Sequence, residues 1–391
     1  MHKSIQTLIK AIREEALDGW LFCNFAHRDT LTDTILGLDT HTVSTRSWYY
    51  LLLAEGLAVK IVHAMETDVL KSLPGEISVY TSQHELSSLL ARFSGKRFAV
   101  LYDTDLTVLS TVSASHLALA VSCGIKQVSA ARLIQRVNVF SEHDYESHEQ
   151  AAKVLYRTIS KVWAFITEQF KYKKTLYEGE VQDFMMAEIS KAGMLTDNPP
   201  IVAAGINSAN PHYSVPSEAA KNRGSVIKSD TIIQFDLWAK FPQGMYADIS
   251  WVGFTGKKLD YEIEEMFLTL RKSRDLVVPA INEALDQNKE ISGAELDIIV
   301  RKNLFSYVDP CYIRHRTGHG IDSNCHGSGV NLDSIEFPDS RPIIEGSCFS
   351  VEPGIYCESY GMRTEINIYI RNGRPIISGG PIQNIILTLQ D

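Results

Sequence analysis

The sequence predicts two domains, a smaller α/β domain over residues 1–140 and an α+β domain over residues 141–391. The chain has 391 residues, which is more than one compact core usually holds. Up to about Val137, short apolar runs alternate with helical patterns, as is typical of α/β domains. Beyond Ser141, helical patterns are separated from groups of strands, which indicates the α+β class.

The amino-terminal domain is expected to begin with an amphipathic helix, because Ile5, Leu8, Ile9 and Ile12 recur at helical spacing. A second helix is predicted over residues 84–93. Strands are predicted over four apolar runs: 19–25, 47–54, 58–64 and 97–103. No glycine-rich phosphate loop follows any of these strands, so nothing in this domain supports a nucleotide site.

The second domain is expected to open with a long helix over 141–170, where Ser141 and Asp144 have the spacing of a capping box. Another capping box is predicted at Ser292 and Glu295. Further helices are expected over 178–193 and from about Tyr261 to Leu285. Strands are predicted over six runs: 199–205, 231–239, 246–254, 346–356, 362–370 and 382–389.

Composition narrows the possible partners and location. The net charge is −9 and no run rich in Lys or Arg occurs, so nucleic acid is not an expected partner. The first 22 residues lack the pattern of a secretory signal, and the apolar run 48–59 is too short to span a bilayer. Six scattered cysteines form no CxxC motif and indicate reduced thiols. We therefore expect a cytoplasmic protein without a membrane partner.

Four acidic residues stand inside apolar strand patterns of the second domain. Asp236 and Asp248 lie on two strands joined by a turn, and Glu352 and Glu365 lie on a second apparent hairpin, with His319 between the two pairs. Neighbouring buried carboxylates repel each other unless a proton or a cation lies between them. Four negative charges balance two divalent cations, so the pattern predicts a dinuclear metal site.

The order of these five residues resembles that of the pita-bread metallopeptidases. The segments that carry the resemblance are "YADISW", "TGHGID", "FSVEPGIY" and "MRTEINIY". The resemblance covers about 141–391. The preceding α/β domain is similar to that of the creatinase-type, two-domain branch, which includes Xaa-Pro aminopeptidases and prolidases.

This resemblance implies a role for each ligand. Asp236 would bind one metal ion, Asp248 and Glu365 would bridge both, and His319 and Glu352 would bind the other. Glu352 is also the expected proton shuttle for the attacking hydroxide between the metals. Two divalent ions are implied: manganese is expected, with cobalt, zinc or iron as alternatives.

Further catalytic roles follow from the same resemblance. His326 would donate a hydrogen bond to the substrate carbonyl and its developing oxyanion. His212 in "NPHYSVP" and His315 would contact the substrate. Arg363 would orient Glu365 through a charge-assisted hydrogen bond.

The resemblance implies a metallopeptidase that hydrolyses the amino-terminal Xaa-Pro bond of peptides or dipeptides and forms a homodimer. The peptide substrate would carry proline at its second position. Two alternatives are a creatinase-like hydrolase of non-peptide amides or amidines and a non-catalytic interaction module on the same fold. The complete set of five ligands argues against both.

Three features depart from the family pattern. Twelve residues separate Asp236 from Asp248, so the hairpin is expected to contain a longer turn or a bulge. Gly327 follows His326 where many members have an acidic residue, and "RTEIN" replaces the commoner "RIED". Cys325, next to His326, is interpreted as a small packed thiol rather than as a nucleophile or a zinc ligand.

Overall fold

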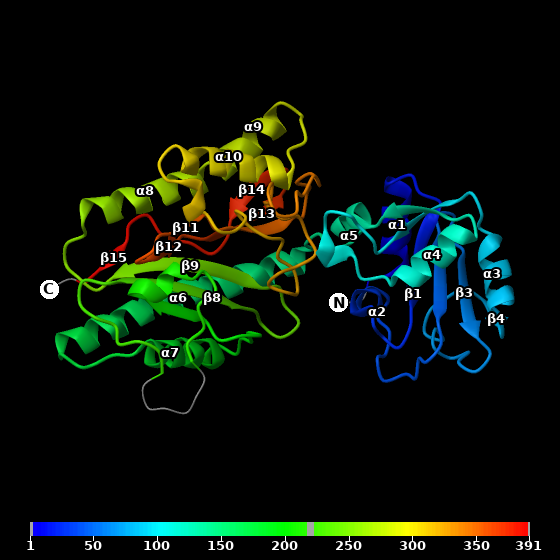
Figure 1. The fold of residues 1–391 in the computed structure, drawn as a ribbon, viewed down its shortest axis with the longest axis horizontal. Coiled ribbons are helices and arrows are strands. Elements are labelled where there is room, and N and C mark those ends of the chain that lie inside the picture. The colour runs from blue at the N-terminus through cyan, green and yellow to red at the C-terminus, as the bar shows by residue number, and fades with distance from the viewer. Residues whose placement is uncertain (1–2, 217–222, 390–391) are drawn as a thin grey trace. The chain divides into compact units, whose positions relative to one another are not determined.

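The computed structural model describes residues 3–216 and 223–389. Its contacts divide the chain into two compact units, Met1–Asn138 and Val139–Asp391 (Figure 1). This division falls two residues before the domain boundary expected at 140/141. Within the described part of the chain, no helix combines the length and the apolar character needed to cross a membrane.

The amino-terminal unit contains a six-stranded mixed sheet with the order β4-β3-β2-β1-β5-β6. The central strand β1 pairs antiparallel with β2 and parallel with β5. The strands are β1 (Gly19–Asn24), β2 (Trp48–Leu53), β3 (Ala58–His63), β4 (Glu76–Tyr80), β5 (Arg97–Val100) and β6 (Lys126–Ser129). The helices are α1 (Ile5–Glu14), α2 (Thr30–Leu36), α3 (Gln83–Ala91), α4 (Ala114–Ser122) and α5 (Ala131–Val137).

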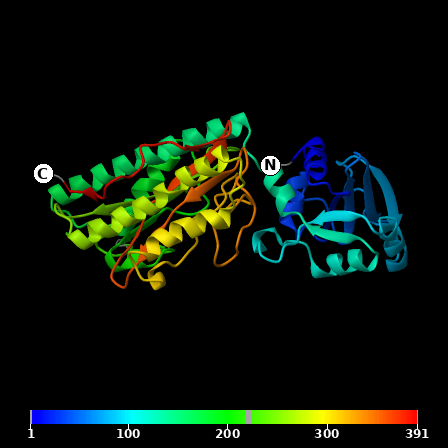
Figure 2. The same ribbon diagram turned by 90° about the horizontal axis from the view of Figure 1, so that it is seen from above.

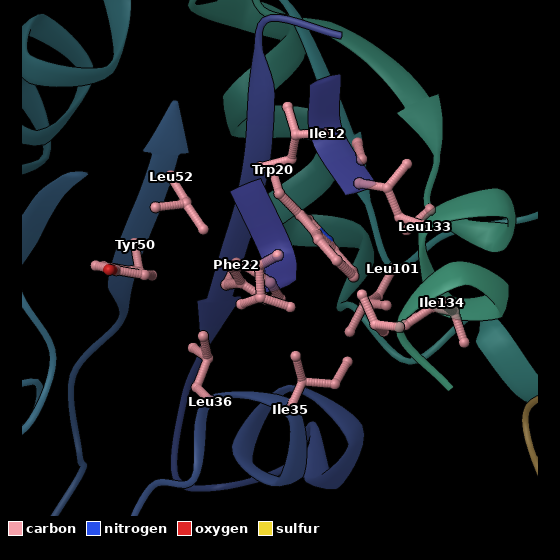
Figure 3. Close-up of a cluster of buried hydrophobic side chains, with 14 of the residues drawn as sticks. Ile12, Trp20, Phe22, Ile35, Leu36, Tyr50, Leu52, Leu101, Leu133 and Ile134 are labelled. Atoms are coloured by element: carbon pink, nitrogen blue, oxygen red, sulfur yellow. The ribbon is translucent and has the colours of Figure 1, made fainter. Parts of the chain in front are cut away.

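Both faces of this sheet are covered by apolar side chains. On one face, Trp20 stacks on Phe22 with ring centroids 4.7 Å apart, and Ile12 of α1 belongs to the same cluster (Figure 3). On the other face, Leu21 packs in a second cluster with Phe98. Burial on both faces explains why β1 and β2 are continuous apolar runs rather than alternating ones.

The second unit contains three sheets. A four-stranded sheet has the order β15-β9-β8-β7, a three-stranded sheet has the order β10-β13-β14, and β11 pairs with β12 alone. The strands of the first sheet are β7 (Ile201–Ala204), β8 (Ile232–Ala239), β9 (Ala247–Phe254) and β15 (Leu387–Thr388). The remaining strands are β10 (Cys348–Val351), β11 (Gly354–Tyr356), β12 (Gly361–Arg363), β13 (Ile366–Arg371) and β14 (Arg374–Ile377).

Helices cover the second unit in two groups. Helices α6 (Glu142–Lys171) and α7 (Glu178–Lys191) lie on one side of β8 and β9 (Figure 1). Helices α8 (Tyr261–Asp275), α9 (Val277–Asp286) and α10 (Gly293–Phe305) lie on the opposite side of the unit (Figure 2). The capping boxes predicted at the starts of α6 and α10 are both present. The carboxylate-bearing strands therefore lie in the interior, between the two helical groups.

Four predicted elements of this unit were wrong in extent. The strands expected over 346–356 and 362–370 are each divided in two, into β10 and β11 and into β12 and β13. The single helix expected from Tyr261 to Leu285 is two helices that meet at Leu276. Pro279 explains the break, because it lacks an N–H and its ring would clash with the carbonyl four residues earlier. The strand expected over 382–389 is paired only at Leu387–Thr388.

Candidate metal centre

Strands β8 and β9 place Asp236 and Asp248 on one face of their hairpin. Asp236 pairs with Ser250, and Asp248 pairs with Trp238, so the two aspartates are diagonal neighbours. The ladder is continuous from the pair of Ala239 with Ala247 to the pair of Ile232 with Phe254. The extra length between the aspartates is therefore a longer turn over 240–246 and not a bulge.

The two glutamates face each other across a second hairpin. Strand β10 pairs with β13 through Val351 and Ile366, so the next pair in register is Glu352 and Glu365. Beyond them, β11 and β12 continue the same register from Gly354 opposite Arg363. Both glutamates thus lie at the break between two short ladders.

His319 lies on an irregular segment that crosses the start of the second hairpin. Its N–H donates to Ser350 Oγ at 3.0 Å, and its carbonyl accepts from the N–H of Ser350 at 2.8 Å. The preceding Gly318 lies so close to β10 that a Cβ there would be 2.0 Å from the Ser350 carbonyl oxygen. A glycine is therefore required for this histidine to reach the two hairpins.

The five predicted ligands converge. His319 Nε2 lies 3.5 Å from Asp248 Oδ2 and 3.4 Å from Glu352 Oε1. Ligand atoms of Asp236, Asp248 and Glu365 lie within 4.8 Å of one another, as do those of His319, Glu352 and Glu365. Three buried carboxylate oxygens in this cluster have no hydrogen-bond partner: Asp236 Oδ1, Asp248 Oδ1 and Glu365 Oε1.

Burial and neighbouring charges shift the pKa values of three carboxylates in the cluster. Burial, together with the negative charge of Asp248, raises the pKa of Asp236 to about 7 despite the opposing effect of Arg363. Burial and the same aspartates raise the pKa of Glu365 well above its ordinary value. Burial also acts to raise the pKa of Glu352, but His319, His315 and Arg363 outweigh it and the net pKa is lowered.

Arg363 does not contact Glu365 directly, and the sequence prediction was wrong on this point. Its guanidinium pairs with Asp236 through Nη2 and donates from Nε to Ser250 Oγ at 3.0 Å. The Ser250 hydroxyl in turn donates to Glu365 Oε2 at 2.9 Å. The arginine therefore reaches Glu365 through a hydroxyl that the sequence prediction missed, although Ser250 stands two residues after Asp248 on the same strand face.

His326 is exposed on a loop built by Asp322. The Asp322 carboxylate accepts from the N–H groups of Asn324 and Ser328, which closes the loop. A Cβ at Gly327 would lie 2.7 Å from Asp322 Cγ, so the glycine in place of an acidic residue fits this compact loop. The loop holds the rings of His326 and His319 with their centroids 4.3 Å apart.

His315 is bound at both ring nitrogens. Nδ1 lies 2.7 Å from the Arg316 carbonyl oxygen and must donate to it, so Nε2 accepts from Tyr356 Oη at 2.7 Å. The same tyrosine oxygen accepts from Arg363 Nη1 at 2.8 Å. Burial lowers the pKa of His315 to about 4. His315 therefore connects to the carboxylates through Tyr356 and Arg363, and no sequence signal had singled out Tyr356.

A cavity of about 530 Å³ opens onto the cluster. His212 and His326 lie at its wall together with four of the predicted ligands, whereas His315 is not among its lining residues. Part of the lining is apolar and rich in rings: Pro199, Pro200, Ile201, Pro211, Tyr213, Val215 and Trp238. The Trp238 indole is fixed by a hydrogen bond from Nε1 to Asp197 Oδ1 at 2.6 Å.

The chemistry of the donor set fits divalent cations. Oxygen-rich sites with one imidazole suit hard and intermediate ions, and the three unpartnered oxygens belong to residues whose ligand atoms lie within 4.8 Å of one another. The structure thus places a cluster of buried carboxylates and one imidazole on a cavity, which is the arrangement of a metal-binding protein with an accessible metal centre.

Comparison with known proteins is consistent with that class. Residues 146–372 match the model of metallopeptidase family M24, and the chain belongs to this family. An Xaa-Pro dipeptidase from Lactobacillus delbrueckii subsp. lactis is 30% identical over 179 residues, which are 46% of this chain and 44% of the relative. The matched region spans about half the length of the curated relatives that head the comparison.

Solved structures share the two-domain fold. Dipeptidase PepE from Mycobacterium ulcerans superposes with a TM-score of 0.71 at 18% identity, over 98% of this chain and 96% of that one. The N-terminal domain of the FACT complex subunit SPT16 from chickpea (Cicer arietinum) has a TM-score of 0.62 at 12% identity, over 97% and 98%. The mixed α/β fold with an M24 domain in its carboxy-terminal part is therefore established, and the predicted family and fold class are confirmed.

Proposed function

We propose that this chain is a dinuclear metal-dependent exopeptidase that hydrolyses the bond between an amino-terminal residue and proline. The single observation that carries the proposal is the convergence of buried carboxylate oxygens without hydrogen-bond partners beside His319. Asp236 would bind one of the two cations, and His319 and Glu352 would bind the other. Asp248 and Glu365 would each bind both cations. When bound, the cations would activate a water molecule and polarise the scissile carbonyl.

Glu352 is suited to accept a proton from the attacking water. Its net pKa is lowered, so it is ionised at neutral pH. Ser350 Oγ donates to Glu352 Oε1 at 3.1 Å, and the Glu352 N–H donates to the Thr317 carbonyl at 2.7 Å. These contacts fix both the carboxylate and its backbone at the base of the cavity.

His326 is suited to stabilise the oxyanion. The neighbouring His319 and burial lower its pKa, so its ring is neutral at pH 7 and still carries one N–H donor. It lies on the cavity wall, within reach of a substrate carbonyl oriented by the ligand cluster. His212 would contact the substrate from the same wall, and His315 would act through Tyr356.

The ring-rich part of the cavity lining supports proline at the second substrate position. A proline peptide bond has no N–H, so recognition depends on packing against the pyrrolidine ring. Pro200, Tyr213 and Trp238 supply such a surface. The named relative of Lactobacillus delbrueckii is an Xaa-Pro dipeptidase, which agrees with this choice.

The proposal extends to manganese as the metal, a homodimer and a cytoplasmic location. The oxygen-rich donor set supports manganese. A non-catalytic role is the alternative, because the fold also occurs in a subunit of the FACT complex. The complete ligand cluster favours catalysis over that role and over a creatinase-like hydrolase.

The test is hydrolysis of Xaa-Pro dipeptides, Xaa-Pro-Yaa tripeptides and Xaa-Ala controls by manganese-loaded protein. We expect turnover that depends on proline, that is lost in Glu352→Gln and that is kept in Glu262→Gln, which changes an exposed carboxylate of α8. Full activity of Glu352→Gln would refute the role of Glu352. No turnover of any peptide by protein that binds two metal ions would refute the peptidase proposal.

A further inference from the structure

The Cys325 thiol lies inside the ligand cluster. Its side chain is 3% exposed, and Sγ donates a hydrogen bond to Asp248 Oδ2 at 3.0 Å. Ligand atoms of Asp248, His319 and Cys325 all lie within 4.8 Å of one another. The compact loop closed by Asp322 holds the cysteine there, so its position is built into the fold.

An independent observation indicates that this group is incomplete without a cation. The Asp248 side chain is almost fully buried, yet its second oxygen, Oδ1, has no hydrogen-bond partner. Buried polar atoms normally have partners, and an unpaired carboxylate oxygen is costly. A cation bound beside Asp248 would remove this cost, and the sulfur lies close enough to share that cation.

Three contacts have lengths close to those of ligand atoms that share one cation. Metal–ligand bonds of about 2.1 Å for nitrogen and oxygen and about 2.3 Å for sulfur separate the ligand atoms of a tetrahedral site by roughly 3.4–3.6 Å. The His319 Nε2 contacts with Asp248 Oδ2 and Glu352 Oε1, at 3.5 and 3.4 Å, already have this length. The contact of Cys325 Sγ with Asp248 Oδ2, at 3.0 Å, would lengthen by about half an ångström.

We propose that Cys325 is a metal ligand on the His319 side of the centre and gives this side a preference for thiophilic divalent ions, such as cobalt, zinc or cadmium. The inference rests on the metal centre proposed above and deepens it. The other side, with Asp236, Asp248 and Glu365, offers only oxygen ligands and suits manganese. The centre would then hold two different cations.

Coordination by Cys325 requires no oxidant or reductant. The thiol proton that is now donated to Asp248 leaves to solvent, and the sulfur lone pair forms the bond to the cation. The hydrogen bond between Sγ and Oδ2 is replaced by a cation shared by both atoms. Binding of a thiophilic ion therefore releases the thiol proton of Cys325 to solvent.

The test is titration of the full-length, metal-free protein with Co²⁺ and, separately, with Mn²⁺. We expect a near-ultraviolet sulfur-to-cobalt charge-transfer band in the wild-type protein and in Cys348→Ser, a control at another buried cysteine. The band should be absent from Cys325→Ser. Cobalt affinity should fall at least about tenfold in that variant, the lower end of what even an indirect partner of a ligand contributes, while manganese affinity is unchanged.

Two results would overturn the inference. Wild-type protein that binds cobalt without the band would show that the sulfur is not a ligand, and this result does not depend on any variant folding. An equal loss of cobalt and manganese affinity in Cys325→Ser would show that the thiol acts only as a hydrogen-bond donor to Asp248. Failure of the wild-type protein to bind either ion would instead refute the proposed metal centre itself, and this inference with it.

Discussion

Replacing Glu365 with glutamine tests the reasoning about the carboxylate cluster most directly. Because burial and nearby acidic residues raise the pKa of Glu365 well above its ordinary value, the metal-free protein favours the neutral form of this side chain. Glutamine has nearly the same shape and is also neutral. We therefore expect Glu365→Gln to change the stability of the metal-free protein little while it removes a bridging ligand.

The structure sets the magnitudes. An ionised Glu365 at the 4.8 Å limit from another carboxylate would be repelled by about 3.5 kcal/mol at an effective dielectric constant of about 20. The raised pKa of Glu365 reduces this cost, because it favours the protonated form in the metal-free protein. The glutamine carbonyl can accept the Ser250 hydroxyl as Oε2 does now, and its amide can donate to the aspartates. The free energy of unfolding should therefore change by no more than about 1 kcal/mol, one typical hydrogen bond.

Metal addition should affect the stability of the wild-type protein and of Glu365→Gln differently. A ligand present at 100 times its dissociation constant stabilises the folded state by about 2.7 kcal/mol. We expect manganese to give the wild-type protein a gain of this order and to give Glu365→Gln little or none. The assay is urea unfolding, followed by circular dichroism, in chelator and in excess manganese.

Glu178→Gln is the matched control, because Glu178 is equally buried but lies outside the cluster. Its carboxylate accepts from the N–H groups of Ala204 and Ser225, both at 2.7 Å, and from Tyr213 Oη at 2.8 Å. An amide cannot accept all of these, so this variant should be destabilised in chelator by about 1–3 kcal/mol and keep the manganese effect. Our account of the cluster would be refuted if Glu365→Gln were destabilised in chelator and kept the manganese effect, while Glu178→Gln kept its stability and lost that effect.

Three further predictions concern catalysis, pH and packing. His326→Ala should lower kcat about a hundredfold or more with an unchanged metal content by elemental analysis, and loss of metal would mean that His326 is a ligand. Burial lowers the pKa of His148, so below about pH 6.5 the unfolded chain binds a proton that the folded chain does not. The contribution of His148 to the unfolding free energy should therefore decrease as the pH falls below about 6.5. In urea titrations of the metal-free protein, His148→Asn should lose this contribution and lose less stability than the wild-type protein on acidification; equal pH dependence of the two proteins would contradict this. Gly318→Ala should cost about 1–3 kcal/mol in the same assay, because its Cβ would meet the Ser350 carbonyl, and an unchanged stability would contradict the close approach.

The sequence predicted the elements whose local signals are strong. Helices α6 and α10 begin at the predicted capping boxes, and β8 and β9 match their apolar runs within a residue or two. Strand β4 was not predicted, because it is largely exposed at the edge of its sheet and lacks an apolar run. The short β14 was missed as well, since Pro375 and two partly exposed isoleucines give little strand pattern.

The sequence likewise predicted some features of the candidate site and missed others. The residue types and order of Asp236, Asp248, His319, Glu352 and Glu365 predicted a dinuclear metal site, because four acidic residues and a histidine together supply the charge and ligands for two cations, although a pair of buried aspartates alone would not. The hairpin pairing of the acids followed from their strands. The partner of Arg363 could not be predicted from the sequence, because a side chain of that length can reach several acceptors and the tertiary packing selects among them.

The sequence by itself thus determined the fold class, the family resemblance and the set of candidate ligands. Strand periodicity, capping boxes and the order of acidic residues are local properties that the chain carries in one dimension. The tertiary structure alone decided that Cys325 contacts Asp248, that Ser250 links Arg363 to Glu365 and that His315 is hydrogen-bonded to Tyr356. These contacts join residues 41 to 115 positions apart, and which of them form depends on how two hairpins and a loop pack together.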